Sequence, residues 1–338
     1  MFIALISDIH ANLQALDAVV QDARQLAHQA SCLDHSSPTL RFWCLGDIFG
    51  RGPSPEDVWD RVAQDLQPDC WVVGNHDQEL VRLINDPSLG EDKAKREQWE
   101  KDFGSLSDAT TIIRHWKHFQ MIGRVNEIQQ QIVNLPVMVS PLPGVYLAHG
   151  SFGLNKRPLA ERPRECVEEY IKQYREVTTT WEVLSEFVKR PQLFRNFQNM
   201  HQIQWKKPSI MIVGHWHIRS FYKFENNRWQ PSPIINDDVI NLWLDLPNTP
   251  AQPVLINPGS VGSPRLPKDA MLKDFCASYA IIDWNERNPR IMFRRVPYDR
   301  NKTLRLLRES QYPPKISEKL EGKCTSSPSR QCQWCKES

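Results

Sequence analysis

The stretch that decides the fold is Cys44-Leu45-Gly46-Asp47-Ile48-Phe49-Gly50-Arg51-Gly52, in which the apolar run 42–45 ends in a glycine-rich turn. Such a run predicts a short buried strand, and the turn places Asp47 directly after it. Open α/β folds have their ligand sites at the carboxyl ends of strands. An aspartate in this position is equally typical of a turn or a helix cap. The importance of Asp47 therefore depends on the residues that follow the other strands.

Polar side chains that bind metals or move protons follow several other apolar runs. These are Asp8 and His10 after residues 2–6, Asn75 and His76 after residues 70–73, His149 after residues 145–148, and His215 and His217 after residues 210–213. Amphipathic patterns between the first three strands predict two helices, one capped by Asn12 and one beginning at Ser54 and Pro55. Alternation of strand and helix predicts a βαβαβ unit with parallel strands, whose ends meet at one edge.

The remaining chain predicts further elements in a less regular order. Strands are expected at 132–139, 145–148, 210–213, 221–224, 254–257, 279–284 and 290–296. One helix is expected after Asp108, which would cap it, and another over residues 303–309. The charged residues 85–101 predict a solvated excursion that is partly helical, and residues 226–253 predict mostly loop. Residues 151–208 predict helices, which either pack over the core or form a cap that shapes a substrate site.

Composition excludes several classes of function. The 338 residues are 40% hydrophobic and 24% charged, with a net charge of +2, as in an ordinary soluble globular protein. This charge gives no basic surface for nucleic acid. No apolar run approaches the roughly 20 residues that span a membrane, and the N-terminus lacks the basic region of a signal peptide. We therefore expect a cytoplasmic protein that binds neither membrane nor nucleic acid.

The eight cysteines do not form a disulfide framework. Most are scattered, as is typical of free thiols in a reducing compartment. Three lie in the polar segment 323–338, which is predicted to be a disordered tail, with a zinc site as the alternative: Cys324, Cys332 and Cys335.

Imidazole, carboxylate and amide oxygen together make a mixed ligand set that suits Mn, Fe or Zn. Five of the ten histidines follow predicted strands, and no cysteine does so in the same turns, which argues against a structural zinc site. One histidine in such a turn is usually a structural residue. A whole series of these residues at successive strand ends favours a metal centre around Asp47.

The order of these motifs resembles that of the calcineurin-like metallophosphoesterases: Asp-x-His, Gly-Asp, Gly-Asn-His-Asp, His, and Gly-His-x-His. Residues 257–262 and 277–280, with Tyr298 and Asp299, resemble the small bacterial phosphodiesterase branch of that family. The resemblance covers residues 1–322, with 151–208 as a helical cap insertion. It implies an α/β fold, a four-layer α/β/β/α sandwich of two mixed β-sheets flanked by helices.

The resemblance also implies an activity, the hydrolysis of a phosphodiester or phosphomonoester by in-line attack of a hydroxide that bridges two divalent metals. The implied ligands are Asp8, His10 and His217 for the first metal, Asn75, His149 and His215 for the second, and Asp47 for both. His76 would be the general acid that protonates the leaving group. The implied cofactors are two ions, with Mn expected and Fe, Zn or Ni as alternatives, and the partner is a small phosphorylated substrate.

Arg51 departs from the phosphodiesterase branch, which often has an aromatic residue there. The series Gly46-Asp47-x-x-x-Arg51-Gly52 instead resembles phosphoprotein phosphatases and dinucleoside tetraphosphatases, in which the arginine binds a phosphate oxygen, although Gly50 replaces their acidic residue. Arg51 is thus a candidate substrate-binding residue that would favour monoesters. The alternatives are an arginine that faces solvent or pairs with Glu56 or Asp57, and, for the whole chain, a non-catalytic scaffold on the same fold.

Overall fold

The computed structural model describes residues 1–34, 39–103, 106–150, 209–225, 228–231, 241–247, 252–264 and 276–321. The expected cap at 151–208 and the expected tail at 323–338 lie outside these residues. Among the described helices, none has the length and apolar character that crossing a membrane requires.

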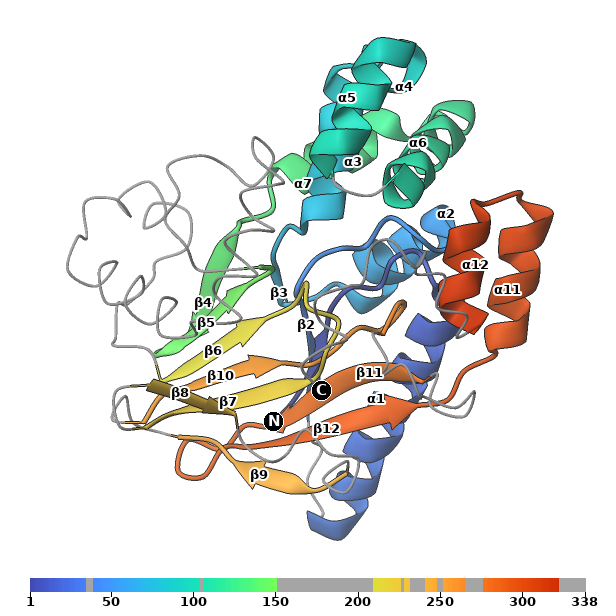
Figure 1. Cartoon of the computed structure of the whole chain (residues 1–338). Helices are drawn as coiled ribbons and strands as arrows, with labels where there is room; N and C mark the ends of the chain where they lie inside the picture. The colour runs from blue at the N-terminus through green and yellow to red at the C-terminus, as the bar shows by residue number, and fades with distance from the viewer. Residues whose placement is uncertain are drawn as a thin grey trace, which may run out of the picture.

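Two mixed six-stranded sheets form the centre of the described structure (Figure 1). The first sheet has the order β3 (Cys70–Trp71), β2 (Leu40–Cys44), β1 (Phe2–Ile6), β11 (Ala277–Asp283), β12 (Arg290–Val296), β9 (Trp243–Asp245). The second has the order β4 (Met138–Leu142), β5 (Val145–Ala148), β6 (Ile210–Val213), β10 (Val254–Asn257), β7 (Ser220–Glu225), β8 (Arg228–Pro231). In the first sheet β1, β2 and β3 are parallel, as predicted.

Helices flank the sheets, and α1 (Leu13–Asp34) packs against β2, β11 and β12. Asn12 caps this helix, because its Oδ1 accepts the main-chain N–H of Ala15 at 3.2 Å. The helix α2 (Pro55–Asp60) continues into a π-helical segment, Arg61–Leu66. Ser54 precedes α2 as predicted, but its side chain makes no capping hydrogen bond. The predicted class, two mixed sheets flanked by helices, is confirmed.

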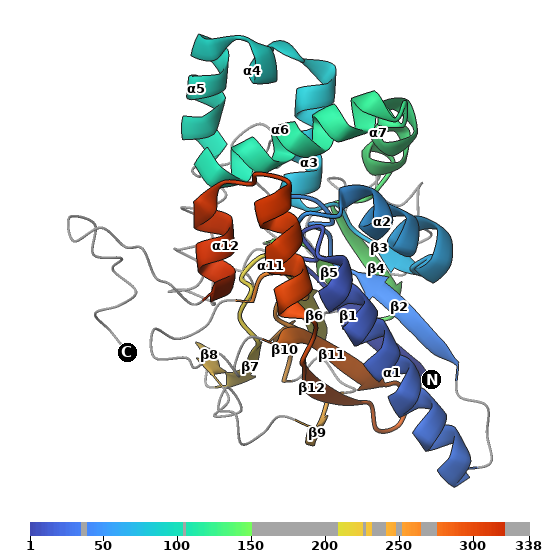
Figure 2. The ribbon, with the colours of Figure 1, turned by 90° about the vertical axis from the view of Figure 1, so that its right-hand side faces the viewer.

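The chain between β3 and β4 forms a lobe of helices at the top of Figure 1. They are α3 (Asn75–Asn85), α4 (Ser88–Glu91), α5 (Lys93–Phe103), α6 (Leu106–Met121) and α7 (Val125–Val133). Near the C-terminus, α11 (Arg300–Glu309) and α12 (Pro314–Glu321) pack together as a pair below this lobe (Figure 2).

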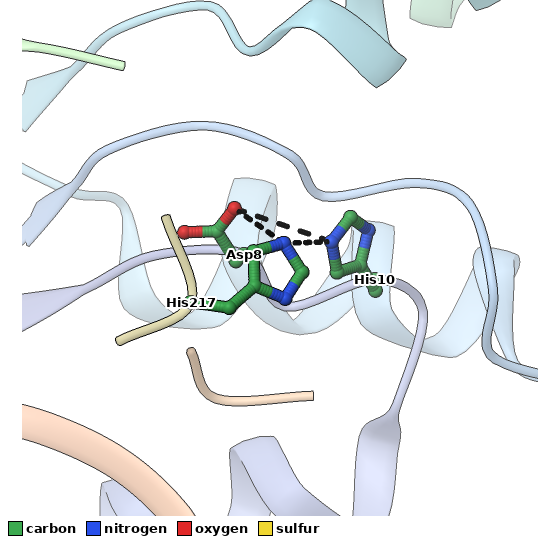
Figure 3. Close-up of side chains that lie close together, drawn as sticks. All are labelled: Asp8, His10 and His217. Atoms are coloured by element: carbon green, nitrogen blue, oxygen red, sulfur yellow. Dashed lines mark hydrogen bonds and ion pairs between the residues drawn. The ribbon is translucent and has the colours of Figure 1, made fainter. Parts of the chain in front are cut away.

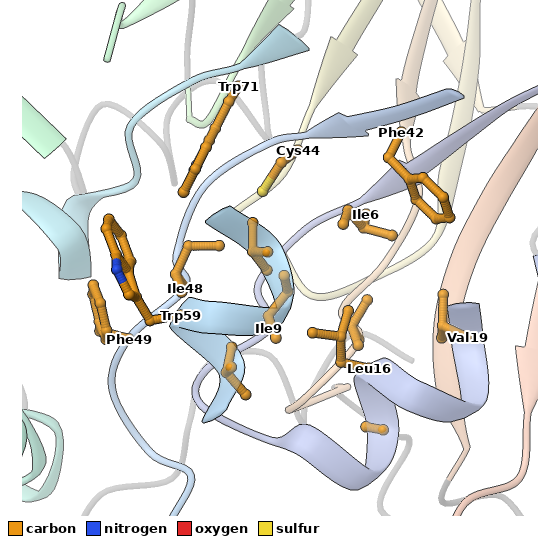
Figure 4. Packing of buried hydrophobic residues seen from close by; sticks show 14 of the residues in the cluster. Ile6, Ile9, Leu16, Val19, Phe42, Cys44, Ile48, Phe49, Trp59 and Trp71 are labelled. Carbon is orange, nitrogen blue, oxygen red and sulfur yellow. The ribbon is translucent and has the colours of Figure 1, made fainter. Parts of the chain in front are cut away.

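Alternation of side chains along β1 divides the apolar core into two layers. Ile3 and Leu5 face the cluster between the two sheets, whereas Ala4 and Ile6 face the cluster under α1. Figure 4 shows Ile6 near Leu16 of α1. Burying one such aliphatic side chain stabilises the fold by about 1.5–3 kcal/mol, so these layers fix the sheet edge that carries the polar turns.

The lobe agrees with the sequence prediction in one segment and contradicts it in another. Residues 85–101 contain α4 and most of α5, and most of their side chains are exposed, as predicted for a partly helical solvated segment, although Trp99 is buried. The strand expected at 132–139 begins only at Met138, because Ile128 and Ile132, one helical turn apart, are buried on α7. The short apolar run at the end of that helix has the composition of a strand, which explains the error.

Three further elements are absent from the sequence prediction. Residues 226–253, expected to be mostly loop, contain β8 and β9. The polar chain after residue 309 contains α12, whose Ile316 and Leu320 pack against Leu304 and Leu307 of α11.

Candidate metal centre

The turns after β1, β2, β5 and β6 meet at one edge of the two sheets, and α3 begins there. Asp8, His10, Asp47, His215 and His217 all have left-handed backbone conformations, with φ between 49° and 65°. Asp and His tolerate this conformation better than most residues. It bends the chain sharply after each strand, so that the side chains return toward one point.

The first cluster brings together Asp8, His10 and His217, the residues that the family resemblance assigns to one metal (Figure 3). The Nε2 atoms of the two histidines lie 3.1 Å apart. The Oδ1 atom of Asp8 lies 3.2 Å from Nε2 of His217 and 4.0 Å from Nε2 of His10. All three side chains are buried, so bulk water cannot solvate these atoms.

Main-chain carbonyls determine which ring nitrogens face the cluster. Nδ1 of His10 contacts the oxygen of Phe49 at 2.9 Å, and Nδ1 of His217 contacts the oxygen of Ser263. A carbonyl only accepts, so each Nδ1 carries the hydrogen and each Nε2 of the neutral ring presents a lone pair. Oδ1 of Asp8 is a third buried donor, and it accepts no hydrogen bond of its own. Three buried electron-pair donors that face one another fit a cation between them.

The second cluster contains Asp47, His149 and His215, with Asn75 beside it. Nε2 of His149 lies 3.3 Å from Oδ2 of Asp47, 3.1 Å from Oδ1 of Asn75 and 3.3 Å from Nδ1 of His215. Nδ1 of His149 donates to the oxygen of Leu45 at 2.6 Å. The same arrangement of nitrogen and oxygen donors therefore recurs here, and it also fits a divalent cation.

Asp47 lies between the two clusters. Its Oδ2 faces His149 of the second cluster and is 3.9 Å from Nε2 of His10 in the first. Its Oδ1 accepts the main-chain N–H of His76 at 2.8 Å, which fixes the orientation of the carboxylate. One carboxylate thus reaches both clusters, which an imidazole in this position could not do with its single lone pair.

The electrostatics of the buried groups favour their metal-binding forms. Burial lowers the pKa of His215 to about 3, and the neighbouring His149 adds to this effect. Burial also lowers the pKa of His10, with a contribution from Arg51. Burial by itself raises the pKa of Asp47, but His149 and His76 outweigh it and hold that pKa well below its usual value. Two imidazoles are therefore neutral and the central carboxylate is ionised.

His149 behaves differently from the other histidines of these clusters. Burial lowers its pKa, but Asp47 outweighs that effect and the pKa rises to about 9. In the metal-free protein this ring holds a proton that stabilises the Asp47 carboxylate. A metal ion must displace that proton to bind, so affinity should fall at low pH.

His76 stands at the start of α3, beside both clusters. Its ring meets the ring of His10 edge-on, with centroids 4.7 Å apart, and its Nε2 lies 3.9 Å from Oδ2 of Asp47. Burial lowers the pKa of His76, and Asp47 opposes this effect. A side chain at Gly50 would meet this ring, since an added Cβ would lie 2.3 Å from Nδ1 of His76.

Arg51 neither faces solvent nor pairs with Glu56 or Asp57. Its Nε and Nη2 each donate to a different oxygen of Asp108, both at 3.2 Å. Its Nη1 donates to Oγ of Ser263 at 3.1 Å and lies 3.2 Å from Nδ1 of His217. The prediction that Asp108 caps a helix is wrong, because α6 begins at Leu106 and this carboxylate binds Arg51.

Sequence reasoning assigned no role to Asp77, which organises the turn that carries Asp47. Its two carboxylate oxygens accept four main-chain N–H groups, those of Gly74, Asp47, Ile48 and Phe49. Burial and the charge of Asp47 raise the pKa of Asp77 to about 6. The signal was present, since Asp77 belongs to the same Gly-Asn-His-Asp motif as Asn75.

Comparisons with known proteins agree with this geometry. The chain is 27% identical over 322 residues to the uncharacterized protein MJ0912 of Methanocaldococcus jannaschii, across 94% of this chain and 96% of that protein. Its fold resembles a metallophosphoesterase from Sphaerobacter thermophilus, with a TM-score of 0.60, 23% identity, and coverage of 96% and 100% of the two chains. It also resembles the hypothetical protein PH1004 from Pyrococcus horikoshii OT3, with a TM-score of 0.55, 14% identity, and coverage of 94% and 97%. The family model of the calcineurin-like phosphoesterases matches residues 1–219, and the chain belongs to that family.

Proposed function

We propose that this protein is a phosphoesterase that requires divalent metal ions and hydrolyses a small phosphodiester or phosphomonoester. The observation that carries the proposal is the convergence of imidazole and carboxylate groups in two clusters, with Asp47 in reach of both. Asp8, His10 and His217 would hold one ion, and Asn75, His149 and His215 the other, with Asp47 contacting both. Manganese is the first candidate, followed by iron, zinc and nickel, because the donors are imidazole nitrogen and carboxylate or amide oxygen.

Two divalent ions, when bound, supply positive charge to the phosphoryl oxygens and make a bound water more acidic. The protein side chains then have separate tasks. Asp77 holds the main chain at Asp47, and the N–H of His76 holds the Asp47 carboxylate in place. His76 has no ligand role in the proposal; its ring lies beside His10 and Asp47, from where it would donate a proton to the leaving oxygen. Asp47 and an anionic substrate both favour the protonated ring against the effect of burial.

Arg51 is a candidate substrate contact, because its Nη1 lies beside the first cluster. This placement favours a second candidate function, a phosphoprotein phosphatase or dinucleoside tetraphosphatase. A guanidinium group makes charge-assisted hydrogen bonds to phosphate oxygens, which would favour a doubly charged monoester. A scaffold without activity is the non-enzymatic alternative, and nothing in the donor set favours it, since each predicted ligand lies in the clusters or, for Asn75, beside them.

The test is hydrolysis of bis(p-nitrophenyl) phosphate and p-nitrophenyl phosphate before and after removal of metal. Dialysis against a chelator should abolish both activities, and Mn²⁺ should restore them better than Mg²⁺, which prefers oxygen ligands. Metal content of the reloaded protein, measured by plasma mass spectrometry, should approach two ions per chain. Full turnover by a protein shown to contain no metal would disprove the proposal.

A further inference from the structure

One face of α6 carries three buried polar residues, Asp108, Thr111 and His115, spaced three and four residues apart. Ile112 and Trp116 of the same helix belong to the apolar core. Buried polar groups are costly unless they are hydrogen-bonded, so their partners indicate what this face of the helix does.

The partners of Thr111 and His115 lie in the turn 50–52, next to Asp47. Oγ1 of Thr111 accepts the main-chain N–H of Arg51 at 3.1 Å. Nδ1 of His115 accepts the N–H of Gly50 at 3.2 Å, so its Nε2 carries the hydrogen and donates to the oxygen of Gly52 at 3.0 Å. The helix therefore fixes the main chain on both sides of Arg51.

Neighbouring residues hold the other side of the same turn. An added Cβ at Gly52 would lie 2.2 Å from the main-chain oxygen of His10, and one at Gly50 would collide with the ring of His76. The turn is thus confined between α6 and two residues of the metal centre. Because its main chain has so little freedom, the Arg51 side chain starts from one defined position.

Asp108 then determines which N–H groups of the Arg51 guanidinium remain available. The two bonds to its carboxylate occupy the Nε and Nη2 edge and leave Nη1 bonded to Ser263 and close to the ring of His217. Only 16% of the Arg51 side chain and 7% of the Asp108 side chain are exposed, so solvent screens this ion pair weakly. The carboxylate therefore offsets most of the positive charge that Arg51 would otherwise bring to the centre.

We propose that Asp108 is a specificity-determining positioning residue, which orients Arg51 and offsets its charge so that the centre prefers a singly charged phosphodiester to a doubly charged phosphomonoester. The inference rests on the proposed function and specifies its substrate class. An arginine whose charge is uncompensated would instead favour the doubly charged monoester. The reason is electrostatic. A second negative charge on the substrate is stabilised less by a neutral ion pair than by an unpaired cation.

The experiment compares Asp108→Asn with the wild type in the manganese-loaded protein, on the matched nitrophenyl diester and monoester. Asparagine retains one hydrogen-bond acceptor for Arg51 but removes the negative charge. The ratio of kcat/KM for the monoester to that for the diester should rise on the order of tenfold, mainly through KM. Inorganic phosphate, measured by calorimetric titration, should bind more tightly to the variant at pH 8.

Asp22 of α1 offers a matched control, because it pairs with an arginine of β12 and contacts no residue of the turn 50–52. It forms a similar two-oxygen ion pair with Arg294, through Oδ2 to Nε at 2.9 Å and Oδ1 to Nη2 at 2.6 Å. Asp22→Asn should lower the unfolding temperature as Asp108→Asn does, but it should leave the substrate ratio and phosphate affinity unchanged. A purely structural role for Asp108 would make the two variants alike, with equal losses on both substrates, and would overturn the inference.

Arg51→Gln provides a second arm that does not depend on the folding of Asp108→Asn. It leaves the Asp108 charge uncompensated, so the monoester-to-diester ratio should fall. The double variant Arg51→Gln with Asp108→Asn should return the ratio toward the wild-type value. An unchanged ratio in Arg51→Gln would also overturn the inference. If the metal-loaded wild type hydrolyses neither ester, the proposed function itself fails, and that outcome is distinct from an unchanged ratio in active variants.

Discussion

Oδ2 of Asp77 in α3 accepts the main-chain N–H of Asp47 in the turn after β2 at 2.9 Å, and both aspartates are buried. The same oxygen accepts the N–H of Gly74 at 3.0 Å. The Asp77 carboxylate thus joins the turn after β2 to the start of α3. Asp47 and His76 consequently keep their relative positions.

Asp77→Asn should destabilise the metal-free protein by about 2–3 kcal/mol. The NH2 group of asparagine is a donor, so the main-chain N–H groups that it faces would lose their acceptor. Urea unfolding measures this free energy. Asp299→Asn is the control, since Asp299 caps α11 through the N–H of Lys302 and asparagine caps helices equally well. Equal stability of the two variants would show that the four hydrogen bonds of Asp77 contribute little.

Asp47→Asn should lose metal from both clusters at once, since Oδ2 faces His149 on one side and His10 on the other. We expect a lower metal content per chain and a large loss of rate. Cys44→Ala, which removes a buried free thiol at the end of the same strand, should retain both metal and rate. Two tightly bound ions in active Asp47→Asn protein would exclude a bridging role.

His76→Gln should retain the metal content and lose rate by about 10²–10⁴-fold on esters with poor leaving groups, which need a proton. The loss should be small for nitrophenolate, which leaves readily without one. Rates on methyl and nitrophenyl esters of the same phosphate separate these cases. An identical loss on both esters would indicate that His76 positions the phosphate instead.

Gly50→Ala should displace the ring of His76, because the added Cβ would lie 2.3 Å from Nδ1 of that ring. Gly123→Ala is a close control, since Gly123 also has a positive φ, of 73°, but has no atom within 4 Å of an added Cβ. Both variants should lose about 1–2 kcal/mol of stability from the left-handed backbone. Only Gly50→Ala should reproduce the leaving-group dependence of His76→Gln.

His115 should make the fold less stable in mild acid. Burial lowers its pKa to about 3, whereas an unfolded histidine titrates near 6.5. Below the unfolded value the unfolded chain binds the extra proton, so stability is full above that pH and falls as the pH decreases toward 3. From pH 7 to pH 5.5 this histidine should cost about 1.2 kcal/mol.

His115→Asn should remove that part of the pH dependence in the metal-free protein. Replacement of an exposed histidine, His28→Asn, is the control for the loss of an imidazole as such. Urea unfolding at the two pH values measures both. The same slope in wild type and His115→Asn would mean that His115 is accessible to protons in the folded state.

Local patterns were sufficient to predict much of the fold and most of the candidate centre. The strand ends that carry Asp8, Asp47 and His149 could be found because each apolar run and its polar exit are adjacent in the chain. The pairing of Arg51 with Asp108 could not be found in that way, because 57 residues separate them and α6 must fold before they meet. Likewise α7 was missed because its burial depends on contacts with α3.

The left-handed backbone at Asp8, His10, Asp47, His215 and His217 has a consequence for how such a centre can change in evolution. Aspartate, asparagine and histidine are the non-glycine residues that occupy this conformation most readily, and all three also donate electron pairs to metals. Exchanges among them can alter the charge and hardness of the donor set while each turn keeps its shape. Glutamate or cysteine would strain the same turns. The backbone thus limits the repertoire of donors, and with it the range of metals that descendants of this chain could adopt.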